Sequence, residues 1–395
     1  MSTRPDVTIT DVRAHVLVAP DSDDSLTSSA QDTFLVVVET DAGIVGVGEA
    51  DVNPFIARAC LSAPGTHTMG RSLREVLMGQ DPRDTDALWR RMYVGSAMNG
   101  RRGAVIHTMS AVDMALWDLR GKLAGRPTHE LLGGPVQKGV RPYASLQPVG
   151  TSFEAYRDSL CEWAARACAL GFRAVKAEVT MNGPYAHSGL HESYDRHTEV
   201  VAAVRQTIGP DVVLMVDVQY MWPDAATAAA VLRAWESFDL YMIETPIWSD
   251  DLDGYAELAT ATSIPIAAGE WLATRWEFEA LMDRGRIAIA QPDVGRVGGF
   301  SEAMIVARMA EERGVTIVPH CWKTGVSSAA TAHFAFATTA CAFIEYLPPQ
   351  LCVETLRKEL AQDNVRIEDG IIVPPSAPGL GIEIDWDVVR RYEVA

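Results

Sequence analysis

The chain reads VVLMVD at residues 212–217, LYMIE at 240–244 and IPIAAGE at 264–270, and each of these apolar runs ends in a carboxylate. The three acids, Asp217, Glu244 and Glu270, are separated by 27 and 26 residues. One strand, one crossover helix and two loops occupy a segment of that size, and parallel strands need such crossovers. The spacing therefore predicts three consecutive parallel strands whose carboxyl ends carry acids.

The same pattern extends over the second half of the chain. Further apolar runs alternate with amphipathic, alanine-rich stretches, and they lie at 140–147, 174–179, 287–294, 316–322 and 343–347. Eight strands that alternate with helices favour an α/β fold with a closed parallel barrel. A doubly wound sheet is the second candidate. That fold usually carries a Gly-rich phosphate loop after its first strand, and the chain contains no GxGxxG or Walker sequence.

The first part of the chain reads differently. Two strand-like segments at 7–18 and 33–50 precede a helical pattern at 107–125, which Gly125 and Pro127 should end. A Gly-Gly-Pro turn at 133–135 then marks a domain boundary. We therefore expect a small α+β domain at 1–135, a barrel at 136–350 and a tail at about 351–395 that packs back on the first domain. The stretches at 20–33 and 51–65 are expected to be long loops.

Composition excludes several classes of protein. The 395 residues include 34 basic and 52 acidic side chains, a net charge of −18, which argues against a nucleic-acid partner and an anionic membrane. No apolar run approaches the roughly 20 residues of a membrane span, and the N-terminus lacks a signal-peptide core. The six cysteines form no CxxC pair. We expect a cytoplasmic protein with reduced thiols.

Charged or titratable residues fall at seven consecutive strand ends. In chain order they are Lys176 with Glu178, Asp217 with Gln219, Glu244, Glu270, Asp293, His320 and Glu345. The carboxyl ends of barrel strands meet at one face, where active sites of such barrels lie. Buried charges are tolerated when they are paired or bound to a metal, so this set predicts a site rather than core packing.

The three acids at 217, 244 and 270 would repel one another without a cation. Oxygen ligands without cysteine or histidine favour Mg²⁺, with Mn²⁺ as the second candidate. The alternative is three separate salt bridges at helix starts. Asp293 and His320 lie 27 residues apart, which is again one repeat, and a carboxylate beside an imidazole fixes its tautomer and raises its basicity.

These segments, taken together and in order, resemble the enolase superfamily and specifically its mandelate racemase subgroup. The segments that carry the resemblance span essentially the whole chain and include ALWDLRGKLAGRPTHELLGG at 115–134, GFRAVK at 171–176, IETP at 243–246, AGE at 268–270, PDVGRVGG at 292–299, PH at 319–320 and IE at 344–345. The resemblance implies an α+β capping domain over a modified (β/α)₇β TIM barrel, one Mg²⁺ per subunit, a small carboxylate substrate and assembly into a homo-oligomer.

The resemblance also implies roles for individual residues. Asp217, Glu244 and Glu270 match the metal ligands, and His320 with Asp293 matches the base that removes the proton α to the substrate carboxylate. Lys176 matches a lysine that neutralises this carboxylate, Glu345 an acid that hydrogen-bonds the enolic oxygen, and Arg296 a basic position of the family. The loops near 20–33 and 51–65 would form a substrate-selecting lid.

One position departs from the family pattern and bears on the reaction. Where the family often has Lys-x-Lys, this chain has Lys176-Ala177-Glu178, and Gln219 stands where a galactonate-type dehydratase would have histidine. Racemisation needs two acid/base groups, so a single obvious base favours dehydration of an acid sugar to a 2-keto-3-deoxy acid by a lyase. Glu178 could be a second acid/base group, an ion-pair partner of Lys176 or a substrate-orienting group, and we favour the last two roles.

Other functions stay open at this stage. A cycloisomerase or a racemase/epimerase would use the same chemistry without loss of water. A catalytically silent homologue is a candidate of another class. An amidohydrolase barrel lacks support because the HxH expected on its first strand is missing.

Several side chains next to the strand ends are candidates for substrate contacts, namely Gln219, Tyr220, Trp322 and Lys323. Lys323 could bind a distal hydroxyl or a second carboxylate, or it could be an exposed loop lysine. His187 and His191 are four residues apart and could bind a metal on a helix, but we favour a surface or substrate-loop role.

Overall fold

A computed structural model gives the structure of the chain, and it describes residues 7–19, 32–187, 190–362 and 365–394. The expected lid stretch at 20–31 lies outside the described residues. Within them, no helix is long and apolar enough to cross a lipid bilayer.

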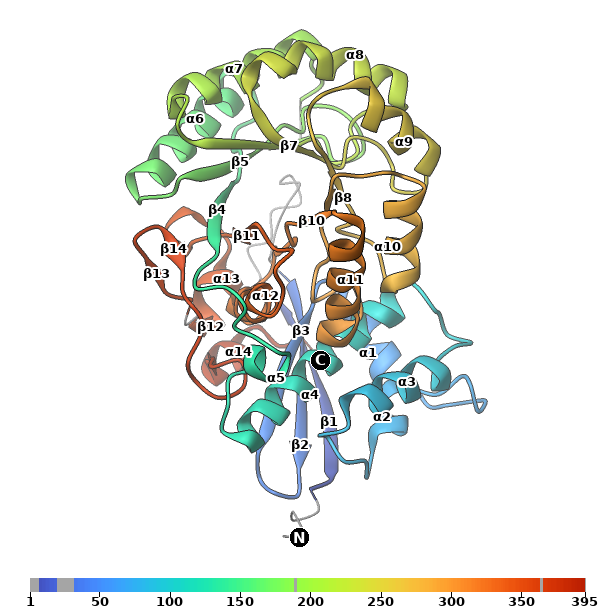
Figure 1. Ribbon diagram of the computed structural model, residues 1–395. Helices are drawn as coiled ribbons and strands as arrows, with labels where there is room; N and C mark the ends of the chain where they lie inside the picture. Colours follow the sequence, from blue (N-terminus) through green and yellow to red (C-terminus); the bar gives the residue numbers. More distant parts are fainter. Residues whose placement is uncertain (1–6, 20–31, 188–189, 363–364, 395) are drawn as a thin grey trace.

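The chain begins with an antiparallel sheet of three strands, which lies below the barrel in Figure 1. Its strands are β1 (Ile9–Val18), β2 (Asp32–Thr40) and β3 (Val45–Ala50). A turn at 41–43 joins β2 to β3, and Gly43 supplies the positive φ of 71° that this turn needs. The alternation of apolar and polar residues in β1 predicts this half-buried strand.

Helices cover one face of this sheet and continue toward the barrel. They are α1 (Pro54–Ser62), α2 (Leu73–Leu77), α3 (Thr85–Gly95), α4 (Ala104–Ala124) and α5 (Thr128–Leu131). Helix α4 packs so closely on β3 that a Cβ atom at Gly48 would lie 2.0 Å from the carbonyl oxygen of Ala111. As predicted, α4 ends at Gly125, which takes the left-handed conformation.

Eight parallel strands form the barrel, in the sheet order β10-β9-β8-β7-β6-β5-β4-β11. The strands are β4 (Arg141–Leu146), β5 (Ala174–Glu178), β6 (Val213–Asp217), β7 (Leu240–Glu244), β8 (Ile266–Ala268), β9 (Ile289–Ala290), β10 (Thr316–Ile317) and β11 (Phe343–Tyr346). A parallel bridge between Ile317 and Cys341 nearly closes the ring. The predicted barrel is confirmed.

Seven helices connect these strands. Those at 153–283 form the arc that Figure 1 shows around the upper half of the molecule, and those at 299–336 lie lower, toward the N-terminal sheet. The seven helices are α6 (Phe153–Ala169), α7 (Tyr194–Ile208), α8 (Ala225–Trp235), α9 (Leu252–Ala261), α10 (Thr274–Asp283), α11 (Gly299–Arg313) and α12 (Gly325–Phe336). A short 3₁₀ helix, η1 (Glu236–Phe238), follows α8. Seven helices between eight strands give the (β/α)₇β arrangement.

Apolar side chains fill the barrel interior. The residues of this buried layer are Tyr143, Ala174, Met215, Met242, Ala267, Ile289, Val318 and Phe343. Because the layer closes the barrel from below, polar side chains at the carboxyl ends of the strands lie above a packed floor, where a small molecule can be held away from bulk water.

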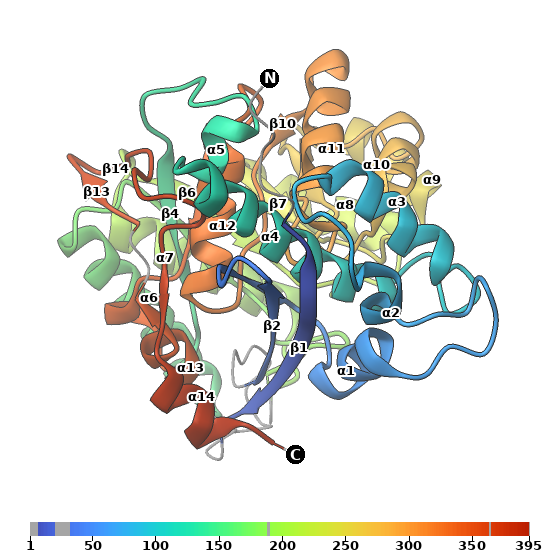
Figure 2. The same ribbon diagram turned by 90° about the horizontal axis from the view of Figure 1, so that it is seen from below.

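The tail contacts both parts of the molecule. Its elements are η2 (Pro349–Leu351), α13 (Thr355–Glu359), β12 (Ala361–Gln362), β13 (Ile367–Glu368), β14 (Ile371–Ile372), β15 (Glu383–Ile384) and α14 (Trp386–Tyr392). Figure 2 shows α14 beside β1, where His15 and Glu393 approach to 2.9 Å. Ile372 bridges Val140 just before β4. The division at 135 and 350 stays a prediction.

One expectation for the N-terminal part was wrong. The stretch at 51–65 is not a continuous loop, because α1 occupies its centre. The Asn53 side chain accepts hydrogen bonds from the amides of Phe55 and Ile56, and Pro54 stands at the first helical position. Both are strong helix-start signals.

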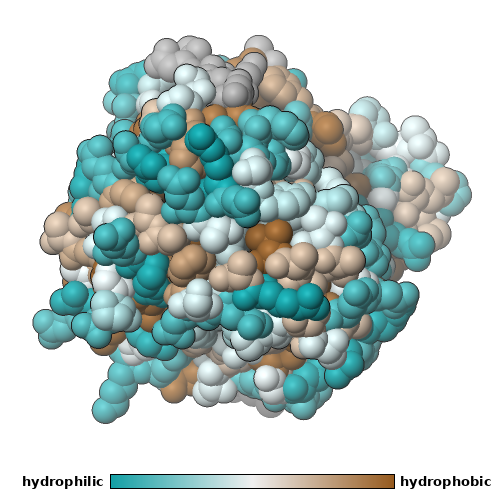
Figure 3. Space-filling view, turned by 90° about the horizontal axis from the view of Figure 1, so that it is seen from above, coloured by the Kyte–Doolittle hydropathy of each residue, from teal (hydrophilic) through white to brown (hydrophobic). Residues whose placement is uncertain are grey.

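From above, the surface in Figure 3 is a mixture of hydrophilic areas and small, scattered hydrophobic ones.

Candidate active site

The predicted acids converge at the carboxyl ends of adjacent strands. Glu178, Asp217 and Glu244 are the last residues of β5, β6 and β7, and the strand register sets Glu178 opposite Asp217 and Asp217 opposite Glu244. Glu270 follows β8 after a bend at Gly269, where φ is +117°. Glu345 lies on β11. All five carboxylates are buried.

Lys176 lies at the centre of these acids. Its Nζ atom is 3.0 Å from both carboxylate oxygens of Glu244, 2.8 Å from Oε1 of Glu345 and 3.8 Å from Oδ2 of Asp217. Burial alone would lower the pKa of Lys176, but Glu244 and Glu345 outweigh it and raise the pKa well above its usual value. Lys176 is therefore a buried, permanently charged group.

Asp217 is held by a strained piece of backbone. Its Oδ1 atom accepts hydrogen bonds from the amide of Gln219 at 2.9 Å and from the hydroxyl of Thr245 at 3.0 Å. Gln219, Tyr220 and Thr245 all have positive φ values, of 43°, 62° and 46°. Such conformations are costly for residues other than glycine and are found mostly at functional sites.

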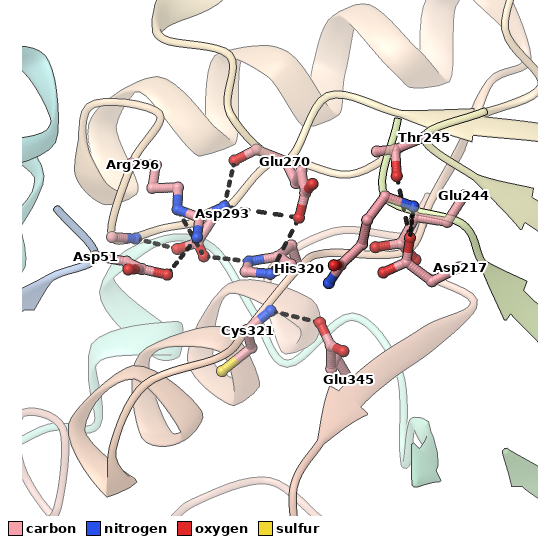
Figure 4. A network of polar contacts seen from close by, with 12 residues as sticks. Asp51, Asp217, Glu244, Thr245, Glu270, Asp293, Arg296, His320, Cys321 and Glu345 are labelled. Atoms are coloured by element: carbon pink, nitrogen blue, oxygen red, sulfur yellow. Dashed lines mark hydrogen bonds and ion pairs between the residues drawn. The ribbon is translucent and has the colours of Figure 1, made fainter. Parts of the chain in front are cut away.

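The chemistry of Asp217, Glu244 and Glu270 fits a hard divalent cation. Burial raises the pKa of Asp217 well above its usual range, and the neighbouring Glu244 raises it further. Burial also raises the pKa of Glu244, despite Lys176. One lysine therefore does not compensate the charge of this cluster, and oxygen donors suit Mg²⁺. In Figure 4 the Glu270 side chain lies between the Asp217 and Glu244 pair on one side and His320 on the other, and it points toward His320.

Among the described residues, the group whose ligand atoms already lie close enough together to hold a metal is a different one. Ligand atoms of Asp51, Asp293 and His320 lie within 4.8 Å of one another. Its charge, however, is already balanced by protein cations, because Asp51 forms ion pairs with Arg296 and Lys323. Burial would raise the pKa of Asp51, but these two cations outweigh burial and leave this pKa well below its usual range. We therefore favour the three acids on β6, β7 and after β8.

The predicted pair of His320 and Asp293 is formed. Nδ1 of His320 lies 2.6 Å from Oδ2 of Asp293, and Nε2 lies 3.3 Å from Oε2 of Glu270 (Figure 4). Burial and Arg296 would lower the pKa of His320, but the hydrogen bond to Asp293 and the nearby carboxylates of Glu345 and Glu270 outweigh them and raise it. The imidazole is therefore a strengthened base with a fixed orientation.

A charged group from the N-terminal sheet joins this pair, and the sequence did not predict it. Asp51, just after β3, contacts both Nη2 of Arg296 and Nζ of Lys323. Nζ of Lys323 is also 2.7 Å from Oδ1 of Asp32, at the start of β2. Arg296 donates to the carbonyl oxygen of Glu270 at 3.1 Å and stacks 3.8 Å above the Trp271 ring. Two acids of the N-terminal sheet thus hold two barrel cations.

These groups surround a cavity of about 190 Å³. Its lining residues are Asp51, Ser145, Lys176, Glu178, Tyr185, Asp217, Gln219, Tyr220, Glu270, Trp271, Arg296, His320, Trp322 and Lys323. All four side chains expected to contact substrate belong to this set. Buried Oε1 of Gln219 and Nε1 of Trp322 have no hydrogen-bond partner among the described residues. Both atoms are positioned to contact a polar ligand.

The remaining candidates are placed as follows. Glu345 accepts a hydrogen bond from the Cys321 amide at 2.8 Å, next to His320. Glu178 accepts one from the Thr180 hydroxyl at 3.1 Å. His187 is buried with its ring edge-on to Tyr156, whereas His191 is exposed, and both precede α7 rather than lie on a helix. A helical metal site is therefore not formed, and the predicted surface role fits His191, whereas His187 is a buried residue of the loop.

Comparison with known families matches both parts of the chain. Residues 6–133 match the N-terminal domain of mandelate racemase and muconate lactonizing enzyme, and residues 159–388 match the enolase C-terminal domain-like family.

Characterised relatives cover nearly the full length. The chain is 32% identical to a D-galactarolactone cycloisomerase from Agrobacterium fabrum, over 98% of this chain and 99% of that protein. It is also 32% identical to an arabinonate dehydratase from Saccharolobus solfataricus, over 90% and 89% of the two chains. The crystal structure of the 3,6-anhydro-D-galactonate cycloisomerase from Zobellia galactanivorans superposes with a TM-score of 0.84 at 28% identity, covering 98% of this chain and 100% of that one.

Proposed function

Because the chain belongs to the mandelate racemase and muconate lactonizing enzyme family of the enolase superfamily, we propose that it is a Mg²⁺-dependent lyase that removes water from an acid sugar. The product would be a 2-keto-3-deoxy acid. The observation that carries the proposal is the 2.6 Å contact between His320 and Asp293 at a cavity whose other side is lined by the acids around Lys176.

Asp217, Glu244 and Glu270 would hold the metal, for the reasons of charge and donor chemistry given above. Bound Mg²⁺ supplies positive charge that offsets the negative charge developing on the substrate carboxylate when the α-proton leaves. Lys176 would add a fixed positive charge on the same side. Glu345, whose carboxylate accepts a hydrogen bond from the Cys321 amide next to His320, would hydrogen-bond the enolic oxygen.

His320 would act as the base. Its Nδ1–H would donate to Asp293, which leaves Nε2 unprotonated on the side of Glu270, and both His320 and Glu270 line the cavity. Nε2 takes the α-proton, the bond from the β-carbon to its hydroxyl breaks, and that hydroxyl leaves as water after receiving a proton. The resulting enol loses its hydroxyl proton, takes a proton at the β-carbon and so becomes the ketone. His320 itself can return its proton to the leaving hydroxyl, so one base is sufficient.

Glu178 supports dehydration over racemisation. It occupies the position on β5 where the second base of a two-base site would stand, and its carboxylate accepts a hydrogen bond from Thr180. We infer that Glu178 orients the substrate, because its side chain lines the cavity and its carboxylate is held there by the Thr180 hydroxyl.

A cycloisomerase is the second candidate, because a relative with that activity is similar over 98% of the chain. The two candidates share proton removal by His320 and differ in whether water is lost. Incubation of the Mg²⁺-loaded protein with acid sugars and their lactones separates them. A 2-keto acid indicates dehydration, whereas an isomer of unchanged mass indicates cycloisomerisation.

The test of the shared step is α-proton exchange in D₂O. His320→Asn should slow exchange by about 10²–10⁴-fold, the usual contribution of a general base. His191→Asn, which changes an exposed histidine, is the matched control and should exchange at the unmodified rate. Undiminished exchange in His320→Asn would remove the assignment of the base. No exchange in the unmodified protein with any acid sugar would favour a catalytically silent homologue.

A further inference from the structure

The charges around the cavity bear on how many carboxylates a substrate can carry. Three cations line it, Lys176, Arg296 and Lys323. Each of them already lies against two or more protein carboxylates, as the following contacts show.

Lys323 is the cation closest to the N-terminal sheet. Its Nζ atom is 2.7 Å from Oδ1 of Asp32, 3.1 Å from the carbonyl oxygen of Asp32 and 3.3 Å from Oδ1 of Asp51. An ammonium group has three N–H donors, so these three acceptors match its full donor capacity. The side chain is buried. It is therefore a compensated charge rather than a vacant anion site.

Arg296 is compensated in the same way. Nη2 contacts Asp51, Nη1 is 3.7 Å from Oε2 of Glu270, and Nε is 4.0 Å from Oδ2 of Asp293. Its Nε–H has no hydrogen-bond partner among the described residues. That donor can bind a neutral hydroxyl oxygen, but the guanidinium charge is already offset by three carboxylates.

On the opposite side, Lys176 faces Asp217, Glu244 and Glu345. Four carboxylates line the cavity itself, those of Asp51, Glu178, Asp217 and Glu270. The divalent ion and Lys176 can accept one substrate carboxylate. A second carboxylate, at the far end of an open-chain sugar diacid, would meet compensated cations and further acids.

We propose, building on the acid-sugar function above, that the substrate carries a single carboxylate and that Asp32 and Asp51 enforce this selection by neutralising Lys323. The substrate is thus an aldonate, or an acid-sugar lactone whose second carboxyl is closed as an ester, and not an open-chain dicarboxylate.

The test compares an aldonate with the dicarboxylate of the same carbon number and configuration, in the presence of Mg²⁺. We expect kcat/KM for the aldonate to be at least about tenfold higher, because like charges facing each other in a site are strongly disfavoured. Dissociation constants measured on His320→Asn give the same comparison without turnover, and they should differ in the same direction.

The outcomes separate this inference from the proposed function. Equal or tighter binding of the dicarboxylate overturns the inference, even where water is eliminated. Tighter binding of the aldonate without any turnover overturns the dehydratase but supports the charge selection. Binding of neither compound overturns both.

A variant tests the assigned cause. Asp32→Asn removes one of the two carboxylates that hold Lys323, and its side chain is 38% exposed, so folding should be preserved. The preference for the aldonate should fall by at least about threefold, since an ammonium group that only Asp51 still compensates attracts the second carboxylate more strongly. Asp253→Asn makes the same charge change at a side chain that is 88% exposed on α9 and should leave the preference unchanged. An unchanged preference in Asp32→Asn overturns the role of Asp32.

Discussion

Nδ1 of His320 and Oδ2 of Asp293, which lie 27 residues apart in the chain, approach to 2.6 Å in a buried environment. A carboxylate at this position holds the proton on Nδ1 and leaves Nε2 free to accept another. Asp293→Asn keeps the shape but removes the charge and allows the amide group to donate to Nδ1. We expect α-proton exchange to slow by about 10–10³-fold. Mg²⁺ affinity, measured by calorimetry, should stay within about twofold, and a large loss of affinity would instead place Asp293 in a metal site.

The metal assignment makes a prediction that separates the two groups of candidate ligands. Asp217→Asn should weaken Mg²⁺ binding by at least about tenfold, because even residues that only support metal ligands change affinity by 10–100-fold. Asp51→Asn is the matched variant in the group of Asp51, Asp293 and His320. It should bind Mg²⁺ with nearly unchanged affinity in the same titration. The reverse order of effects would move the ion to the second group.

The side chains at the strand ends could be predicted because the strands recur at a regular interval along the sequence. One strand and one helix per 26 or 27 residues fixes which side chains share the carboxyl face, whatever the loops do. Asp217, Glu244 and His320 follow from this rule alone. The strands that carry Asp293 and His320 are shorter than the apolar runs suggested, with two residues each in β9 and β10, but the side chains still reach the same face.

Asp32 and Asp51 could not be predicted in the same way. They enter the site from a separate sheet, and the contact between Asp51 and Arg296 spans 245 residues of chain. No periodicity links positions so far apart. Their local sequences instead resemble ordinary strand ends. The only local signal near Asp51 was Asn53-Pro54, which marks the start of α1. The role of Lys323, which the sequence left open, depends on these two acids, because both contact its ammonium group.

Glu49 joins the N-terminal sheet to the barrel segment that follows His320. Its Oε2 atom accepts hydrogen bonds from the amides of Thr324 and Ser327 at 3.2 and 3.1 Å, and from their hydroxyls at 3.0 and 2.7 Å. Glu49→Gln would remove the charge that strengthens these four hydrogen bonds and leave only a neutral amide oxygen to accept them. Stability should fall by about 2–4 kcal/mol, measured by thermal unfolding.

The same variant has a catalytic readout. The weaker hydrogen bonds at the start of α12 would fix the segment that follows His320 less firmly, so exchange should slow while Mg²⁺ affinity is kept. Glu154→Gln, on an exposed side chain of α6, is the control. Equal exchange rates in Glu49→Gln and Glu154→Gln would show that the contact stabilises the fold without positioning the base.

His333 on α12 and His129 on α5 form a buried contact, with their Nδ1 atoms 3.1 Å apart and their rings stacked. Burial, with a smaller contribution from His129, lowers the pKa of His333 to about 3. The unfolded chain takes up a proton near pH 6.5, which the folded chain does not take up until about pH 3, so the free energy of unfolding falls as the pH drops below about 6.5. At pH 5.5 the loss from this residue is about 1.4 kcal/mol. Between pH 7.5 and 5.5, His333→Gln should therefore lose less stability in thermal unfolding than the unmodified protein. His67→Gln changes an exposed histidine and should lose as much stability as the unmodified protein. A parallel decline of all three proteins would mean that His333 is protonated in the folded state.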